Sequence, residues 1–433
     1  MTTSPQLAPG ELDPGFANEG RLVLPYPGFT TTNGLCVAEG PDKKIYILGS
    51  SQAQDSDLTN HVSITRLLPD GTLDFSFGTH GTVHIKVPDD DLSAIPTQVF
   101  FLTDQQGRDL ILACVGYDVV GVGTNTLAQL LIRLTASGEL DTSFGEGGFI
   151  PLKSPFEAET RQPLTTDATL SSHSSASAAC INDDKIYLIT SGIDPRLGVS
   201  TGVVSCFNLD GTGDTTFGEN GHAALSKVLD VRSGLNGIVV RDGKIFVCGW
   251  AIGGALLACL NLDGSFNRNF AGTGYTLLRG TAFQFESIAL LSDGRPVATG
   301  FGNTQRTGLL AVYTLDGVID PRFNHGAPIE ESFNPPHQVM FLAVAIQDDK
   351  IIASGRYFVG VTPYFVAAKY QIDGGRDTNF GAGKGWSVPE LPVRRAMAYG
   401  MSLQTDRKIL ITGSDYDGIF GRAVLAARLL NSA

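Results

Sequence analysis

The sequence predicts an all-β fold, a seven-bladed β-propeller with four antiparallel strands per blade. A motif of an acidic residue, two variable residues, Phe and usually Gly recurs seven times, with its Phe residues 53 to 73 positions apart. Each copy is followed by four short apolar runs bounded by turn residues, which is the signature of strands. Four strands repeated seven times, about 60 residues per repeat, indicate a propeller.

The motif reads LDPGFANEG at Leu12–Gly20, and a degraded fifth copy, NRNFAGTG at Asn267–Gly274, has Asn in place of the acid. We expect the Asp to accept a backbone N–H two residues on, the Gly to supply a positive φ, and the Phe to wedge between blades. The anchoring residues are Phe16, Phe77, Phe144, Phe217, Phe270, Phe323 and Phe380, with Asp13, Asp74, Asp141, Asp214, Asp320 and Asp377. Calcium sites are the alternative, although each turn offers one carboxylate and calcium takes six to eight oxygens.

The order of the four runs, a to d, predicts how the ring closes. Run a follows the motif, run b precedes a tight turn such as Arg241–Lys244, run c follows that turn, and run d ends the repeat. With run b innermost, the next repeat's run a is outermost. Arg21–Pro25 then completes the last blade, antiparallel to Ala423–Leu430, because an open ring exposes a sheet edge. We expect a flexible tail over residues 1–10 and a single propeller over 11–433, of which 11–25 complete the C-terminal blade.

This repeat resembles the bacterial delta-60 repeat family, whose signature is close to LDxxFGxxG followed by a strand. The resemblance covers Glu11 to Ala433. It implies a β-propeller and little about activity.

The composition excludes several classes of partner. The net charge is −13 and no basic run is longer than Arg394–Arg395, which argues against nucleic acid and anionic membranes. No run of eighteen apolar residues exists, so we expect no membrane insertion. The first ten residues lack the features of a Sec signal peptide, and the six cysteines lie in apolar runs without C-x-x-C spacing. We therefore expect a monomer that is cytoplasmic, as reduced cysteines favour, or exported without a Sec signal.

Alternate turns of the blades lie on opposite faces of the ring. The b–c turns and the Phe motifs are nearly uniform and share one face, called the motif face. The a–b and c–d connections vary in length and share the other, called the variable face; they include Ser51–Asn60, Tyr117–Thr126, Ser154–Ala176 and Gly192–Thr201. Irregular loops on a rigid scaffold commonly carry function.

Polar and aromatic residues near the ends of these loops are the candidate ligand-binding residues. The polar candidates are His173, Glu286, His337, Arg356, Asp118, Asp194 and Asp415. The aromatic candidates are Tyr117, Trp250, Tyr357, Tyr364 and Tyr416. Glu286, inside FQFESIAL, would face a watered channel and bind a cation, or cap a backbone group. The aromatic side chains would stack on sugars or anchor a protein, or pack at blade edges.

No serine-hydrolase elbow, zinc motif, P-loop or dinucleotide fingerprint is present in the sequence, and we expect no cofactor. The leading hypothesis is a non-enzymatic propeller that binds a protein or glycan through the variable face. The alternative is a hydrolase or lyase with a metal or carboxylate cluster at the channel mouth, which three or more converging Asp, Glu or His side chains would favour. A third hypothesis is a structural domain of a larger bacterial surface or toxin assembly.

Overall fold

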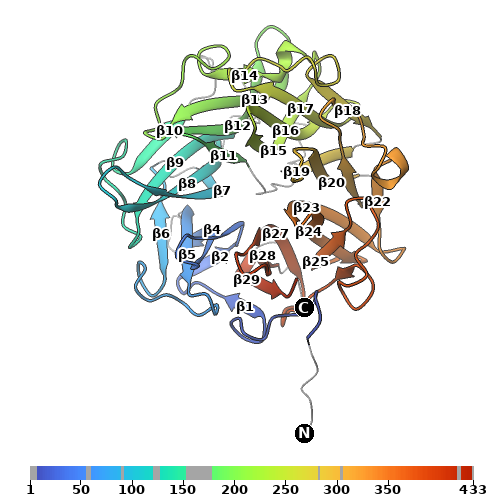
Figure 1. The fold of residues 1–433 in the computed structure, drawn as a ribbon. Helices are drawn as coiled ribbons and strands as arrows, with labels where there is room; N and C mark the ends of the chain where they lie inside the picture. The colour runs from blue at the N-terminus through green and yellow to red at the C-terminus, as the bar shows by residue number, and fades with distance from the viewer. Residues whose placement is uncertain are drawn as a thin grey trace.

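The computed structural model describes residues 7–54, 60–88, 92–119, 127–152, 178–280, 283–302, 306–416 and 421–431. Within these ranges, 29 strands form seven antiparallel sheets around a central axis (Figure 1). The helical elements of this part are two three-residue 3-10 turns, η1 (Leu225–Lys227) and η2 (Asn324–Gly326), and none of its helices is long and apolar enough to cross a membrane. The prediction of an all-β, seven-bladed propeller is confirmed.

In blades 1 to 4 the strands follow one another outwards from the axis in chain order. Blade 1 contains β2 (Phe29–Thr32), β3 (Cys36–Glu39), β4 (Ile45–Ala53), β5 (Asn60–Leu67) and β6 (Thr82–Lys86). Blade 2 contains β7 (Leu92–Thr103), β8 (Asp109–Val119), β9 (Leu127–Thr135) and β10 (Phe149–Leu152). Blade 3 contains β11 (Ala179–Asn182), β12 (Lys185–Asp194), β13 (Val199–Asn208) and β14 (His222–Ala224). Blade 4 contains β15 (Ser233–Arg241), β16 (Lys244–Ala251), β17 (Gly254–Asn261) and β18 (Tyr275–Arg279).

Blades 5 and 6 follow the same order, and in blade 7 the first strand of the chain is outermost. Blade 5 contains β19 (Phe283–Leu290), β20 (Pro296–Gly302), β21 (Thr307–Val312) and β22 (Ile329–Glu331). Blade 6 contains β23 (Gln338–Gln347), β24 (Lys350–Val359), β25 (Thr362–Tyr370) and β26 (Trp386–Ser387). Blade 7 contains β27 (Ala396–Leu403), β28 (Ile409–Tyr416), β29 (Gly421–Leu429) and β1 (Arg21–Leu24). Run b is therefore innermost, and the next repeat's run a outermost, as the sequence predicts.

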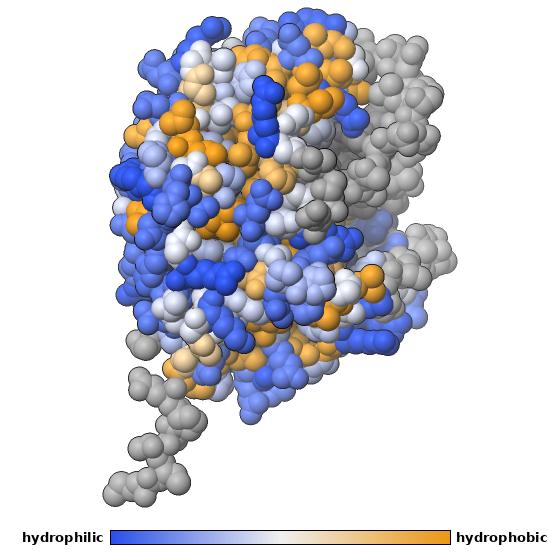
Figure 2. Space-filling model, turned by 90° about the vertical axis from the view of Figure 1, so that its right-hand side faces the viewer, coloured by the Kyte–Doolittle hydropathy of each residue, from blue (hydrophilic) through white to orange (hydrophobic). Residues whose placement is uncertain are grey.

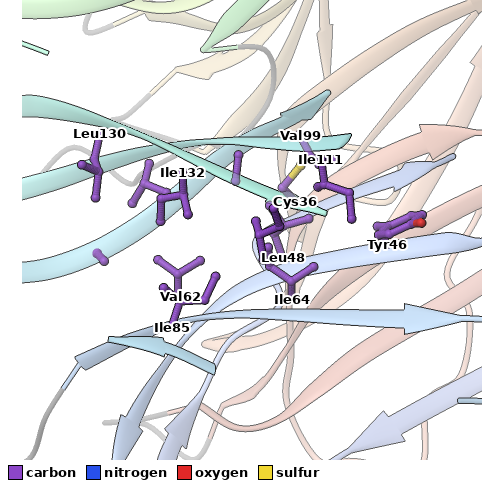
Figure 3. Packing of buried hydrophobic residues seen from close by; sticks show 14 of the residues in the cluster. Cys36, Tyr46, Leu48, Val62, Ile64, Ile85, Val99, Ile111, Leu130 and Ile132 are labelled. Atoms are coloured by element: carbon purple, nitrogen blue, oxygen red, sulfur yellow. The ribbon is translucent and has the colours of Figure 1, made fainter. Parts of the chain in front are cut away.

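The hydrophobic core lies between neighbouring blades. Strand alternation turns one face of each sheet toward the blade before it and the other toward the blade after it. Between blades 1 and 2, Leu48 and Ile64 meet Ile111 and Ile132, all at most 2% exposed (Figure 3). The six cysteines are free thiols, and most of them are buried in these layers.

Every motif Phe except Phe144 packs against the turn that ends strand d of the following blade or, for Phe380, against the N-terminal segment. At the third motif Ile150 lies against the turn glycine Gly211 instead. All seven motif Phe residues are at most 2% exposed. A Cβ placed on Gly71 would lie 2.6 Å from the ring of Phe16, and one on Gly317 would lie 3.0 Å from that of Phe270. Both glycines also have a positive φ, 84° and 81°. Glycine is thus required there both by the space that the Phe occupies and by the turn.

Backbone hydrogen bonds reinforce the same contact. The N–H groups of Ala17, Gly78, Gly218, Ala271 and Asn324 donate to carbonyls of the following blade's turn at 2.6 to 2.9 Å. For Phe380, in the last motif, the partner turn is supplied by the N-terminal segment. There the Gly381 N–H donates to Pro9 O at 2.9 Å, and the Gly10 N–H donates to Leu430 O at 2.7 Å. Residues 9 and 10, which the sequence analysis places in a flexible tail, therefore bond to two parts of the ring.

The strand β1 completes blade 7. It pairs antiparallel with β29, with Arg21 opposite Ala427 and Leu24 opposite Val424. The first and the last strand of the chain thus lie side by side in one sheet (Figure 1). This is the closure that the order of the runs predicts.

Deleting residues 1–24 removes β1 and the Pro9–Gly10 contacts together, which leaves the β29 edge unpaired. We expect the midpoint of thermal unfolding to fall by roughly 5–10 °C or more, measured by calorimetry. Deleting residues 1–6 alone is the control, because both deletions remove these residues and only the longer one removes residues 7–24. Equal midpoints for the two deletions would show that the N-terminal segment does not close the ring.

Replacing Phe323, which is fully buried, by Ala should cost about 3–5 kcal/mol of unfolding free energy, because a cavity opens between blades 5 and 6. Phe75 is 70% exposed and belongs to the second motif, so Phe75→Ala is the matched control, with a change below about 0.5 kcal/mol. Urea unfolding measures both. A small effect at Phe323 would contradict the role of the Phe as a wedge.

Candidate functional site

On the motif face, every motif carboxylate is occupied by groups of its own chain. One oxygen accepts the N–H two residues on, as when the Gly15 N–H donates to Asp13 Oδ1 at 3.0 Å. Asn267 keeps this turn, accepting from the Asn269 N–H at 3.1 Å. The other oxygen meets a cation, as in the pairs Asp13–Arg428, Asp74–Arg66, Asp141–Arg133, Asp214–Lys185, Asp320–Arg322 and Asp377–Lys350. These contacts favour a structural role for the motif over a calcium site.

The innermost strands carry β-bulges near their variable-face ends. The pairing register shifts at Asn236, Glu286, Leu342 and Tyr399, one in each of blades 4 to 7. A glycine of the neighbouring strand lies opposite each bulge. At Gly300, for example, a Cβ would come within 1.9 Å of Gln284 O. Since a bulge redirects a side chain, it decides which inner residues face the channel and which face the next blade.

Two sequence-predicted candidates, Glu286 and Arg356, lie at this level. Glu286 is 0% exposed, and Gln284 Nε2 donates to its Oε1. Glu286 is thus buried, rather than exposed to a watered channel, at the residue where the pairing register shifts. Arg356 is 5% exposed. Burial lowers its pKa, and the negative charge of Glu286 opposes that shift.

His337 and Tyr357 are also brought together. His337 Nδ1 is hydrogen-bonded to the Tyr357 hydroxyl, with the ring centroids 5.2 Å apart. Tyr357 lies 5.6 Å from the ring of Trp386, on which Phe333 stacks at 4.8 Å. Sequence analysis missed Phe333 and Trp386, because Trp386 sits in an ordinary strand run and 53 residues separate the two.

The remaining polar candidates are separate around the ring. Asp194 is 1% exposed, and Arg196, whose guanidinium lies 2.6 Å from it, lowers its pKa. This carboxylate is therefore paired within its own loop. Asp415 and Tyr416 are half-buried at the end of β28, where the Tyr416 N–H donates to Arg395 O at 3.1 Å.

The other aromatic candidates are packed against their own chain or lie beyond what the structure describes. Trp250 is half-buried, with the Arg232 guanidinium 5.9 Å from its ring, and Tyr364 is half-buried on β25. Tyr117 and Asp118 belong to β8, but their side chains lie outside the part that the structure describes. His173 also lies outside the described residues.

Apolar side chains stand exposed at the tips of three c–d turns on the variable face, which sequence analysis did not single out. Their exposed fractions are 37% for Leu197 in blade 3, 62% for Ile252 in blade 4, and 43% and 80% for Val359 and Val361 in blade 6. The motif face exposes Phe75, Leu262, Leu315 and Val318. On the outer edge, apolar residues are scattered among polar ones (Figure 2).

The described residues do not bring together a set of metal ligands. Among the residues that the structure describes, no group of three or more His, Cys, Asp or Glu is placed to hold a metal ion. The buried thiols are held protonated, since burial raises the pKa of Cys36 and of Cys180 to about 12. The described part of the variable face thus offers apolar tips and half-buried aromatic rings.

Comparison with known proteins agrees with a propeller. The family model described as a domain of unknown function (DUF5122) beta-propeller matches residues 40–77 and 241–270, which supports a β-propeller repeat family. No curated protein matches the chain.

Similar solved structures include a protein of unknown function from Dyadobacter fermentans, at 10% identity and a TM-score of 0.48, covering 96% of this chain and 100% of that one. The polysaccharide lyase Uly1 has 11% identity and a TM-score of 0.47, with coverages of 92% and 90%. Sqt1 from Chaetomium thermophilum, bound to the N-terminus of ribosomal protein L10, has 12% identity and a TM-score of 0.47, with coverages of 93% and 98%. At these values neither a ligand nor a reaction follows for this chain.

The motif carboxylates should make stability depend on pH. Donation from Lys185 and Thr216 lowers the pKa of Asp214 from 3.8 to about 2. The folded state therefore favours the charged form, and this stabilisation is present above about pH 4 and lost as the pH falls toward 2. Asp214→Asn, which copies the natural Asn267, should fold and show a shallower fall in unfolding free energy between pH 5 and pH 3. Parallel pH curves for the two proteins, measured by urea unfolding, would contradict this electrostatic role.

Proposed function

We propose that this chain is a non-enzymatic interaction propeller, of the delta-60 type its seven motifs resemble, that binds a protein through the variable face. The observation that carries the proposal is the exposure of Ile252 and Val361 at the tips of tight c–d turns. These turns connect β16 to β17 and β24 to β25, leaving two residues between the strands, Ile252–Gly253 and Gly360–Val361. Two-residue hairpins favour Asn, Asp and Gly at such positions, so a β-branched apolar residue there is unfavourable for the turn.

An apolar side chain that is exposed where the turn itself does not favour it can be buried by contact with a protein partner. Glycan binding would rest on aromatic rings that are free to stack on a sugar. The candidates Trp250 and Tyr357 instead pack against their own chain, with Trp250 beside Arg232 and Tyr357 against His337 and Trp386. A protein is therefore the better supported of the two partners.

The alternative of a hydrolase or lyase receives less support from the described side chains. Acid–base chemistry needs carboxyl groups within reach of a substrate. Asp194 is paired with Arg196, and Glu286 is fully buried. Glu331 is held by Arg376, at 2.7 Å, and by the Tyr370 hydroxyl.

A photo-crosslinking amino acid at position 361 or 252 should capture the same partner, and the same group at position 75 on the motif face should not. With that partner purified, Val361→Asp and Ile252→Asp should each weaken binding at least about tenfold, since a charge is placed against an apolar contact. Phe75→Asp is the matched control, because Phe75 is 70% exposed on the opposite face. Crosslinking from position 75, or unchanged affinity in the 361 and 252 variants, would overturn the proposal.

A further inference from the structure

Arg356 is a charged residue at an inner position that is uncharged in other blades. It directly follows Gly355, the glycine opposite the β23 bulge. In blades 1, 4, 5 and 7 the residue directly after the corresponding glycine is Ser50, Trp250, Phe301 or Ser414. The fold therefore does not require a guanidinium at this position.

One contact of Arg356 has a structural purpose. Its Nε donates to Ala398 O at 2.9 Å, next to the bulge at Tyr399 in blade 7. Between blades 4 and 5 the same need is met by a neutral amide, since Asn236 Nδ2 donates to Phe285 O at 2.8 Å. An amide suffices for this purpose, so the charge and the other donors of Arg356 remain to be explained.

Apart from this bond, the Arg356 guanidinium has no acceptor among the residues that the structure describes. Within the described part of the chain it forms no ion pair, and Nε carries its one hydrogen bond. The two terminal nitrogens are not among the polar atoms that are fully buried without a hydrogen-bond partner. They therefore keep some contact with solvent, although the whole residue is only 5% exposed. A guanidinium so enclosed is costly to bury when the nearby carboxylate of Glu286 acts on it by charge but forms no ion pair with it.

Tyr399 adds a second donor beside it. The Arg356 guanidinium lies 4.7 Å from the centroid of the Tyr399 ring. The Tyr399 hydroxyl makes no hydrogen bond to the described residues. It is also not among the polar atoms that are fully buried without a partner, so it keeps contact with solvent. The guanidinium and the tyrosine ring are therefore close to each other, and both groups retain solvent access.

The surroundings favour an anion of single charge. Arg306, which stacks 4.7 Å over Phe358, contributes positive charge to the same region, and its charge lowers the pKa of Arg356. Met340, 7% exposed, pairs across the sheet with Arg356 and supplies an apolar neighbour that strengthens electrostatic attraction. The negative charge of Glu286 acts on the same guanidinium and would repel a dianion more than a monoanion.

We propose that Arg356 and Tyr399 form an anion site at the variable-face end of the channel, and that this site takes a carboxylate group. The parallel N–H bonds of a guanidinium match the two oxygens of a carboxylate, with the Tyr399 hydroxyl donating to one of them. The inner strands β19, β23 and β27 of blades 5, 6 and 7 follow one another around the axis (Figure 1). The site does not depend on the variable face binding a protein.

The test is a titration of the full chain with acetate at constant ionic strength. Binding is monitored by NMR of the ¹⁵N-labelled arginine side chains. The Arg356 signal, assigned by its loss in Arg356→Lys, should shift saturably. Arg356→Lys should weaken binding at least tenfold, as seen in the remaining arginine signals and by calorimetry. Tyr399→Phe should weaken it at least threefold, and Glu286→Gln should tighten it.

Arg394→Gln is the matched control, because Arg394 is an exposed arginine in the a–b connection before β27 on the same face, and it should bind acetate as the native chain does. Tyr399→Phe keeps the Arg356–Ala398 bond, so it remains informative if Arg356→Lys is unstable. The proposal is overturned if acetate gives no saturable shift, if both Arg356→Lys and Tyr399→Phe bind as the native chain does, or if phosphate binds more tightly than acetate.

Discussion

The structure depends on the contact between a Phe of one repeat and a turn glycine of the next. Phe16 lies under Gly71 and Phe270 under Gly317, and in each case a backbone bond joins the same two turns. Apart from the third motif, each motif thus gives a Phe to one neighbouring blade. Such an arrangement is complete only as a closed ring. At the last position Phe380 meets Gly10, which lies far from it in sequence and takes the place of the turn glycine.

This contact also explains why the two faces differ. The motif face carries the Phe packing, the Asx turns and the pairs of carboxylates with Lys or Arg. The motif side chains there already contact other parts of the chain, so few of them are available to bind a ligand. The opposite ends of the strands are free of these constraints. There the hairpin tips vary and the inner strands bulge, so that residues such as Val361 and Arg356 can differ between blades without loss of the ring.

Much of the fold could be predicted from the sequence because its determinants are local and repeated. The motif, the tight turns and the apolar runs fix the number of blades, the strand order and the closure by Arg21–Leu24. The inner strand of blade 1 is one exception, since it is divided into β2 and β3 around Gly34. There Gly34 approaches blade 7, where its N–H donates to Gly413 O, and that contact is not visible in a single repeat.

The candidate site was less predictable because it depends on contacts between repeats. Glu286 reads as a channel residue from strand alternation, but it is buried at the residue where the pairing register shifts. The sequence predicts that Asp194 is an accessible carboxylate in a loop, but Arg196, two residues later, forms an ion pair with it. Phe333 and Trp386 stack across blades 5 and 6. Tyr399 becomes a candidate binding residue only because Arg356, a residue of another blade, lies beside its ring. The pairings of Phe333 with Trp386 and of Tyr399 with Arg356 join residues of different blades, so they do not follow from local sequence.

Amide hydrogen exchange tests the closed ring most directly. If the inter-blade contacts form one cooperative unit, the amides of Gly218, Ala271 and Gly381, each bonded to a neighbouring turn, should exchange with the same opening free energy, equal to that of global unfolding. The Gly381 amide, whose acceptor is Pro9, is the decisive one. Its exchange through a local opening of much lower free energy, while Gly218 and Ala271 stay protected, would contradict the account.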